Sequence, residues 1–89
     1  MKGRIGKISI NISLIVEKLK EIEEVFSIMR FVPIRAEMMA HKMEIEYIGY
    51  SPMFNEIDEC EEAPLYEVKA EKDAETDTII NVVARREED

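Results

Sequence analysis

The side chains best suited to catalysis are a single histidine and a single cysteine. His41 is the only histidine in the chain and Cys60 the only cysteine, so neither has a companion at the spacing of a zinc site. A catalytic base must also lie within hydrogen-bond reach of the proton it takes, and no neighbour of His41 in the sequence offers such a partner. We therefore interpret His41 as a surface residue at a bend and predict a protein without catalytic residues or cofactors.

Cys60 lies between two glutamates, Glu59 and Glu61. Negative charge on both sides disfavours the thiolate, which is the reactive form of cysteine. We expect the side chain to make a small apolar contact or to form an intermolecular bridge on oxidation. Because one cysteine cannot form an internal disulfide, the sequence favours a reducing, cytoplasmic location.

Carboxylates are concentrated between Glu56 and Glu62, within the connection formed by residues 53–64. A calcium loop needs a glycine at its sharp turn and ligands at regular intervals, and this run has neither. We therefore expect no bound metal and an exposed, solvated loop, because so many carboxylates are costly to bury. A second interpretation is that the run occupies a basic groove on another protein. Its acidic members are Glu56, Asp58, Glu59, Glu61 and Glu62.

Charge is unevenly distributed along the chain. Residues 1–42 hold eight basic and five acidic side chains, whereas residues 43–89 hold four basic and fifteen acidic ones, and the net charge is −8. The acidic second half of the chain repels phosphate groups, which argues against direct nucleic-acid binding. The same charge suits the basic surface of a partner protein.

Aromatic and methionine side chains are gathered just before the acidic run, between residues 47 and 54. Such side chains are enriched at interfaces because they offer large, adaptable contact areas. We predict that this turn binds the partner together with the acidic run, and the alternative is that it folds back on the core. The residues concerned are Tyr47, Tyr50, Met53 and Phe54.

Three arginines, Arg35, Arg85 and Arg86, are candidates for contacts with an anionic small ligand. Their guanidinium groups suit carboxylates and phosphates, but only if the fold brings them together. Their spacing along the chain does not decide this question.

The elements that must position these residues include a helix over residues 12–29. Its apolar residues recur at steps of three and four, which places them on one face. The opposite face carries charged residues, Glu21 among them, so the apolar face must be covered by another element. Asn11 or Ser13 can cap the start of the helix, and Pro33 ends it near Arg30. The apolar stripe consists of Ile12, Ile15, Leu19, Ile22, Phe26 and Met29.

Alternation of apolar and polar residues indicates strands in residues 4–12, 43–50, 65–72 and 78–86. Residues 31–40 are ambiguous, because their alternation favours a strand while several good helix formers leave a helix open. We favour the strand, which would place residues 40–42 at a hairpin bend. The last segment is apolar on both faces, as in a central strand or in a strand that faces a partner subunit.

Together these elements predict an α+β fold, with one amphipathic helix packed on an antiparallel sheet of three to five strands in two layers. Residues 1–89 are enough for one domain, with the acidic loop at 53–64 exposed and the C-terminus frayed. No apolar run approaches the roughly 18 residues of a membrane span. The first residues also lack the apolar core of a secretory signal.

We predict a non-enzymatic, cytoplasmic binding protein, and a homo-oligomer, that inhibits or sequesters a host protein by occupying a basic site on it. Small size and acidity are typical of the inhibitors and adaptors that phages and mobile elements encode. One alternative is an oligomer that sequesters a small, nucleotide-like ligand between subunits. Another is a structural subunit of a larger assembly, with the apolar strand at 79–83 as its contact surface.

Overall fold

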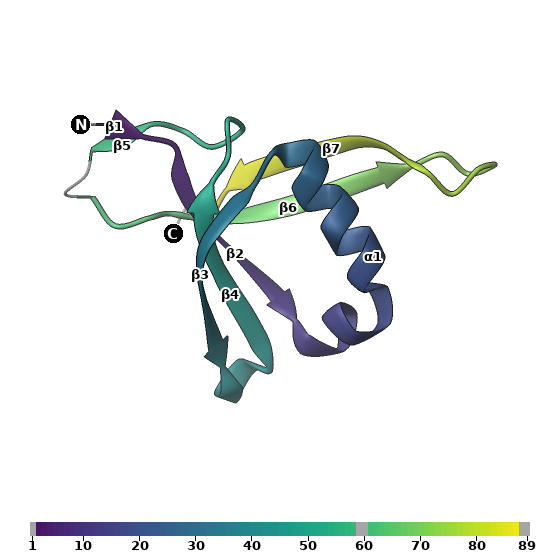
Figure 1. The fold of residues 1–89 in the computed structure, drawn as a ribbon, viewed down its shortest axis with the longest axis horizontal. Coiled ribbons are helices and arrows are strands. Elements are labelled where there is room, and N and C mark those ends of the chain that lie inside the picture. The colour runs from purple at the N-terminus through teal and green to yellow at the C-terminus, as the bar shows by residue number, and fades with distance from the viewer. Residues whose placement is uncertain (1, 59–60, 88–89) are drawn as a thin grey trace.

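Within residues 2–58 and 61–87, the computed structural model has one α-helix lying across a sheet, which confirms the predicted α+β class (Figure 1). In this part of the chain no helix has the length and apolar character needed to cross a membrane. In chain order the elements are β1 (Lys2–Gly3), β2 (Ile5–Asn11), α1 (Ile12–Met29), β3 (Val32–Met39), the short 3₁₀ helix η1 (Ala40–Lys42), β4 (Glu44–Tyr50), β5 (Ile57–Asp58), β6 (Leu65–Lys72) and β7 (Ile79–Arg86).

Five of the strands form the main sheet, in the order β3-β4-β2-β6-β7. All neighbours are antiparallel, as predicted, except β2 and β6, which run parallel and make the sheet mixed. The direction of β6 follows from the connection after β4. That connection leaves Tyr50, opposite Ile5 at the start of β2, and delivers the chain to Leu65, opposite Lys7. β6 therefore starts at the same end of the sheet as β2.

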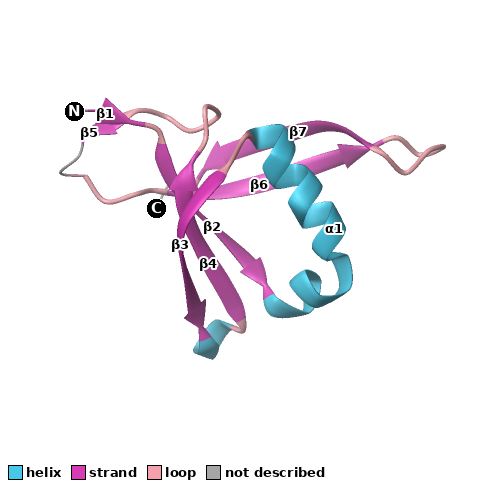
Figure 2. Cartoon of the chain, in the orientation of Figure 1, coloured by secondary structure: helices cyan, strands magenta, loops and turns pink. Residues whose placement is uncertain are grey.

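The parallel pair of strands is short. β2 pairs with β4 from Ile5 to Asn11, but it pairs with β6 only at Lys7, opposite Leu65, and at Ile8. Beyond these positions the strands separate, so that the β2, β3 and β4 ribbons extend toward one side of the molecule and the β6–β7 hairpin toward another (Figure 2). The sheet thus has a closed end, where β2 and β6 pair, and an open end that α1 spans.

Helix α1 occupies the residues predicted from its apolar spacing. Asn11 Oδ1 accepts a hydrogen bond from the backbone N–H of Ser13 at 2.8 Å, which satisfies one of the free donors of the first turn. Arg30 ends the helix with a left-handed backbone (φ 55°). Lys18 departs from helical geometry (φ −131°, ψ 37°), and Leu19 beside this kink is 50% exposed although its spacing placed it in the covered stripe.

Residues 32–39 form strand β3, which resolves the ambiguity of this segment in favour of a strand. β3 pairs with β4 and forms one edge of the sheet. Its apolar side chains are therefore largely exposed, with Val32 at 60%, Ile34 at 56% and Met38 at 65%. The bend to β4 is η1, which carries the exposed His41.

Strand β7 forms the opposite edge and pairs with β6. Its two-sided apolar pattern is therefore not that of a central strand. Val82 points into the core, whereas Ile80 and Val83 are 64% and 46% exposed.

At the closed end of the sheet, four aromatic rings of the core contact one another in series. Ring centroids lie 4.8 Å apart for Phe26 and Phe31, 5.9 Å for Phe31 and Phe54, and 4.3 Å for Phe54 and Tyr66. We call these four residues the aromatic corner. A Cβ atom at Gly6 would lie 2.7 Å from the Tyr66 ring and 2.9 Å from the Phe54 ring, so the ring pair packs directly on the backbone of β2. The buried core also includes Ile8, Ile10, Met29 and Val82.

Candidate functional site

The acidic connection between β4 and β6 is exposed through its carboxylates and anchored through its apolar residues. Phe54 is fully buried and Ile57 is 4% exposed, so the connection has two side chains in the interior. The described carboxylates between them and β6 all face solvent. They are Glu56, Asp58, Glu61 and Glu62. Glu59 and Cys60, which were also singled out from the sequence, lie outside the described residues.

Phe54 is tied to the aromatic corner by polar contacts as well as by its ring. The guanidinium of Arg4 donates a hydrogen bond to the Phe54 carbonyl oxygen at 2.7 Å. The Tyr66 hydroxyl accepts the backbone N–H of Asn55 at 2.8 Å and donates to Asn55 Oδ1 at 3.1 Å. Because these bonds hold the Phe54 carbonyl and the amide of Asn55 that follows it, the connection leaves the core in a defined direction.

The carboxylates are also ordered locally. β5 pairs with β1, which places Asp58 opposite Lys2. The backbone N–H of Glu61 donates to the Asp58 carbonyl at 2.9 Å, and the Glu61 carboxylate accepts the Asp58 N–H at 3.2 Å. Glu62 forms an ion pair with Lys7 of β2 at 3.3 Å. Among the described residues, Asp58, Glu61 and Glu62 are therefore each held by at least one contact.

The predicted partner-binding turn at residues 47–54 divides into buried and exposed members. Tyr47 packs edge-on against Phe26, with ring centroids 5.5 Å apart, and Phe54 is buried, so both rings fold back on the core. Tyr50 and Met53 are 46% and 37% exposed beside the acidic connection. Between them, the buried Ser51 donates its hydroxyl to the Met29 carbonyl at 2.8 Å and accepts the Met53 N–H at 3.1 Å.

The three candidate arginines lie at opposite edges of the sheet. Arg35 belongs to β3, whereas Arg85 and Arg86 belong to β7. The fold therefore does not bring Arg35 to the other two within one chain. Arg35 instead forms an ion pair with Glu37 on its own strand.

A cleft of about 660 Å³ lies beneath α1, between the diverging strands β2 and β6. The helix, the two strands and the bend after β3 all contribute to its wall. Its lining combines apolar and charged side chains. The apolar members include Ile8, Ile10, Leu14, Ile22, Val25, Phe26 and Val68, and the charged ones are Lys18, Glu21, Lys42, Glu44, Glu67 and Glu87.

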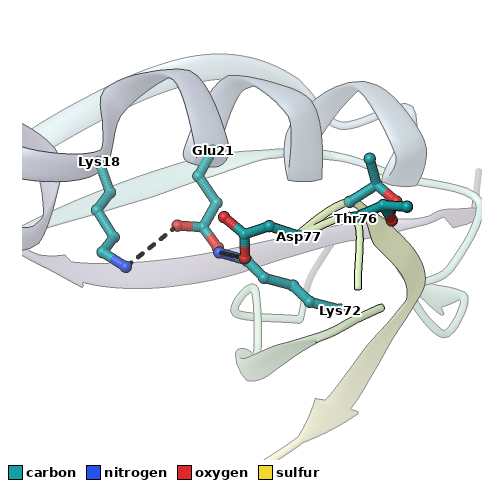
Figure 3. Close-up of polar contacts among 6 residues, drawn as sticks. Lys18, Glu21, Lys72, Thr76 and Asp77 are labelled. Atoms are coloured by element: carbon teal, nitrogen blue, oxygen red, sulfur yellow. Dashed lines mark hydrogen bonds and ion pairs between the residues drawn. The ribbon is translucent and has the colours of Figure 1, made fainter. Parts of the chain in front are cut away.

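One ion-pair cluster connects the helix to the β6–β7 hairpin at the side of this cleft (Figure 3). Glu21 contacts Lys72 directly and lies 3.7 Å from Lys18, and Lys72 lies 3.7 Å from Asp77. The hydrogen bond from Lys72 lowers the pKa of the Glu21 carboxyl below its ordinary value. The same bond raises the pKa of Lys72. Both groups are partly exposed, so solvent weakens the attraction.

Sequence patterns did not indicate this cluster. Helical spacing placed Glu21 on the outer, charged face of α1, but the side chain is only 27% exposed and points toward β6. The cleft was missed for a related reason. It exists because β2 and β6 diverge, and strand divergence leaves no pattern in the sequence.

We compared the chain with models of known protein families, with curated proteins and with solved structures. None of the three comparisons finds a match. In the residues that the structure describes, no three His, Cys, Asp or Glu side chains are grouped so as to hold a metal ion. The function is therefore inferred from the acidic connection and the cleft themselves.

Proposed function

We propose that this protein is a non-enzymatic binding domain that inhibits or sequesters a partner protein by occupying a basic site on it. The observation that supports the proposal is the construction of the acidic connection, whose described carboxylates are exposed while Phe54 and Ile57 are buried. A surface that is ordered before binding loses less conformational entropy when the partner arrives. Complementary charge also accelerates the encounter and discriminates against acidic partners.

The contact surface comprises the acidic side chains and their exposed apolar neighbours. Tyr50 and Met53 supply exposed apolar area just before Glu56 and Asp58 in the chain, and such residues are common at the centres of interfaces. Tyr47 and Phe54 support this surface from the interior and do not touch the partner. The carboxylates give the complex its specificity and its sensitivity to salt.

The test uses two triple variants with the same change in net charge. The first reverses the connection, with Asp58→Lys, Glu61→Lys and Glu62→Lys. The control reverses three exposed carboxylates elsewhere, with Glu24→Lys, Glu71→Lys and Glu75→Lys. Each chain is immobilised, exposed to lysate of the native host at low salt and eluted with a salt gradient.

The proposal predicts one stoichiometric protein that the unaltered chain and the control retain and the connection variant loses. Circular dichroism establishes that both variants remain folded. Equal retention by the two variants, or loss by both, would mean that the acidic connection is not the binding surface.

The cleft favours a second candidate function, the sequestration of a small ligand, and its charged lining consists of two lysines and four glutamates. Its volume falls within the roughly 300–1,000 Å³ typical of small-molecule sites, and Lys18 and Lys42 place amines beside its apolar wall. A nucleotide-like ligand would co-purify and absorb near 260 nm. In that case Lys18→Glu with Lys42→Glu would release the ligand, whereas reversal of the acidic connection would not.

A further inference from the structure

The edge strand β3 carries a self-complementary sequence around Ala36. The residues on its two sides are Arg35 and Glu37, and beyond them lie Ile34 and Met38. Ile34 and Met38 are 56% and 65% exposed. A long apolar edge with unpaired backbone groups is a surface on which another strand can pair.

The charges on this edge are incompletely balanced within one chain. Glu37 lies directly opposite Glu46 of β4, and both carboxylates are half-buried. Like charges directly opposite each other destabilise a sheet. Arg35 offsets this repulsion from its own strand, while the outer side of Glu37 faces the free edge.

We propose that two copies of this chain associate through antiparallel pairing of their β3 strands, centred on Ala36. In this register Ala36 lies opposite Ala36 of the second copy, and each Arg35 lies opposite a Glu37. Every Glu37 then has an arginine on its outer side to counter Glu46 on its inner side. Met38 lies within the regular part of the edge and Ile34 at the irregularity beside it. Both are exposed, so association also removes apolar area from water.

Neighbouring registers lose this complementarity. Centring the pair on Glu37 places the two Glu37 carboxylates opposite each other, and centring it on Arg35 does the same to the arginines. Pro33 and the backbone irregularity between Pro33 and Arg35 limit the regular part of the edge to Arg35–Met39, which discourages longer, shifted pairings. The two sheets would become one continuous sheet across a twofold axis.

Charge reversal with complementation tests the proposal. Arg35→Glu makes this segment wholly acidic and Glu37→Arg makes it wholly basic, so each variant repels its own copy. Sedimentation equilibrium over a dilution series should give a dimer for the unaltered chain and raise the dissociation constant about tenfold for each variant. An equimolar mixture of the two variants should recover the original affinity, because every opposed pair is again of opposite sign.

Complementation separates association from stability, because the Arg35–Glu37 ion pair within one strand is broken in both variants. Arg85→Glu, on the other free edge, is the matched control and should leave the dissociation constant unchanged. The proposal is overturned if the unaltered chain has the mass of one copy at all concentrations, if the mixture stays as weak as its components, or if Arg85→Glu weakens the dimer equally.

The register has its own test, which remains decisive even if a charge variant fails to fold. In a Cys60→Ser background, Ala36→Cys places two thiols across the axis at the roughly 4.5–5.5 Å Cβ spacing of opposed residues, and mild oxidation should cross-link them. Met38→Cys leaves its two thiols about 14 Å apart, four residues along the strands, and should remain uncross-linked. Equal cross-linking at both positions, or none at Ala36→Cys, contradicts the register.

Discussion

The closed and open ends of the sheet are built in different ways. At the closed end, the aromatic corner packs on Gly6, Met29 is fully buried, and the Ser51 hydroxyl bonds the end of the helix. At the open end, β2 and β6 have separated, and a cleft with charged walls lies beneath α1. One helix spans both environments, with Met29 at the first and the kinked Lys18 at the second.

The difference indicates where the stability of the fold is concentrated. At the closed end Met29, Phe31, Phe54 and Tyr66 are buried, so each contributes most of its transfer free energy. Of the side chains that line the cleft at the open end, Leu14, Ile22, Val25 and Val68 keep part of their surface in water and contribute less. The acidic connection is attached at the closed end through Phe54, so the proposed binding surface is carried by the more stable part of the molecule.

The strongest way to disturb the closed end is Phe54→Ala. The change removes a fully buried ring that contacts Phe31 and Tyr66 and leaves a cavity. We expect the free energy of unfolding to fall by about 3–5 kcal/mol, measured by urea denaturation. Tyr50→Ala, at an exposed ring of the same segment, is the control and should cost much less.

Ser51→Ala tests the polar part of the same end. It removes the donor to the Met29 carbonyl, which then stays buried without that partner. The expected loss of unfolding free energy is about 1–3 kcal/mol. A loss as small as that of Ser27→Ala, at an exposed serine of α1, would show that water replaces the hydroxyl.

Ile22→Ala tests the open end. The side chain is only half-buried and borders the cleft, so its removal enlarges a space that is already open to solvent. We expect a loss of about 1 kcal/mol in the same assay. A loss equal to that of Phe54→Ala would contradict the contrast between the two ends.

The smallest effect is expected from Glu21→Gln, and it should depend on pH. The pKa of Glu21 is lowered in the folded state, so its contribution is present above the unfolded pKa and is lost as the pH falls through the folded value. The variant should therefore be slightly less stable at neutral pH and should lose less stability on acidification. The pKa of Lys72 is raised in the folded state. Its contribution to the free energy of unfolding is therefore lost at alkaline pH, as the pH rises through the folded pKa. Unfolding curves at acidic, neutral and alkaline pH check the direction in which each of the two contributions changes.

The sequence was informative where a local pattern determines structure. Steps of three and four residues, the Asn11 cap and Pro33 were sufficient to predict the bounds of α1. Alternation located the principal strands, and the absence of a tight-turn dipeptide at residues 40–42 is consistent with the short helix η1 found there. These features depend on neighbours within a few residues.

Features that depend on distant contacts were not predicted. The parallel pairing of β2 with β6 is set by the path of the whole acidic connection. Phe54 was a candidate contact residue because aromatic side chains suit both interfaces and cores, and its burial against Tyr66 became apparent only in the fold. Exposure of Val32, Ile34 and Met38 follows from the edge position of β3, which alternation alone does not reveal.

Amide hydrogen exchange along α1 tests most directly whether stability is concentrated at the closed end. The account predicts that amides of residues 24–29, next to the aromatic corner, exchange only on global unfolding. Amides of residues 16–20, around the Lys18 kink, should exchange faster by at least about tenfold, through local opening over the cleft. Equal protection along the whole helix, or slower exchange around Lys18 than near Met29, would contradict it.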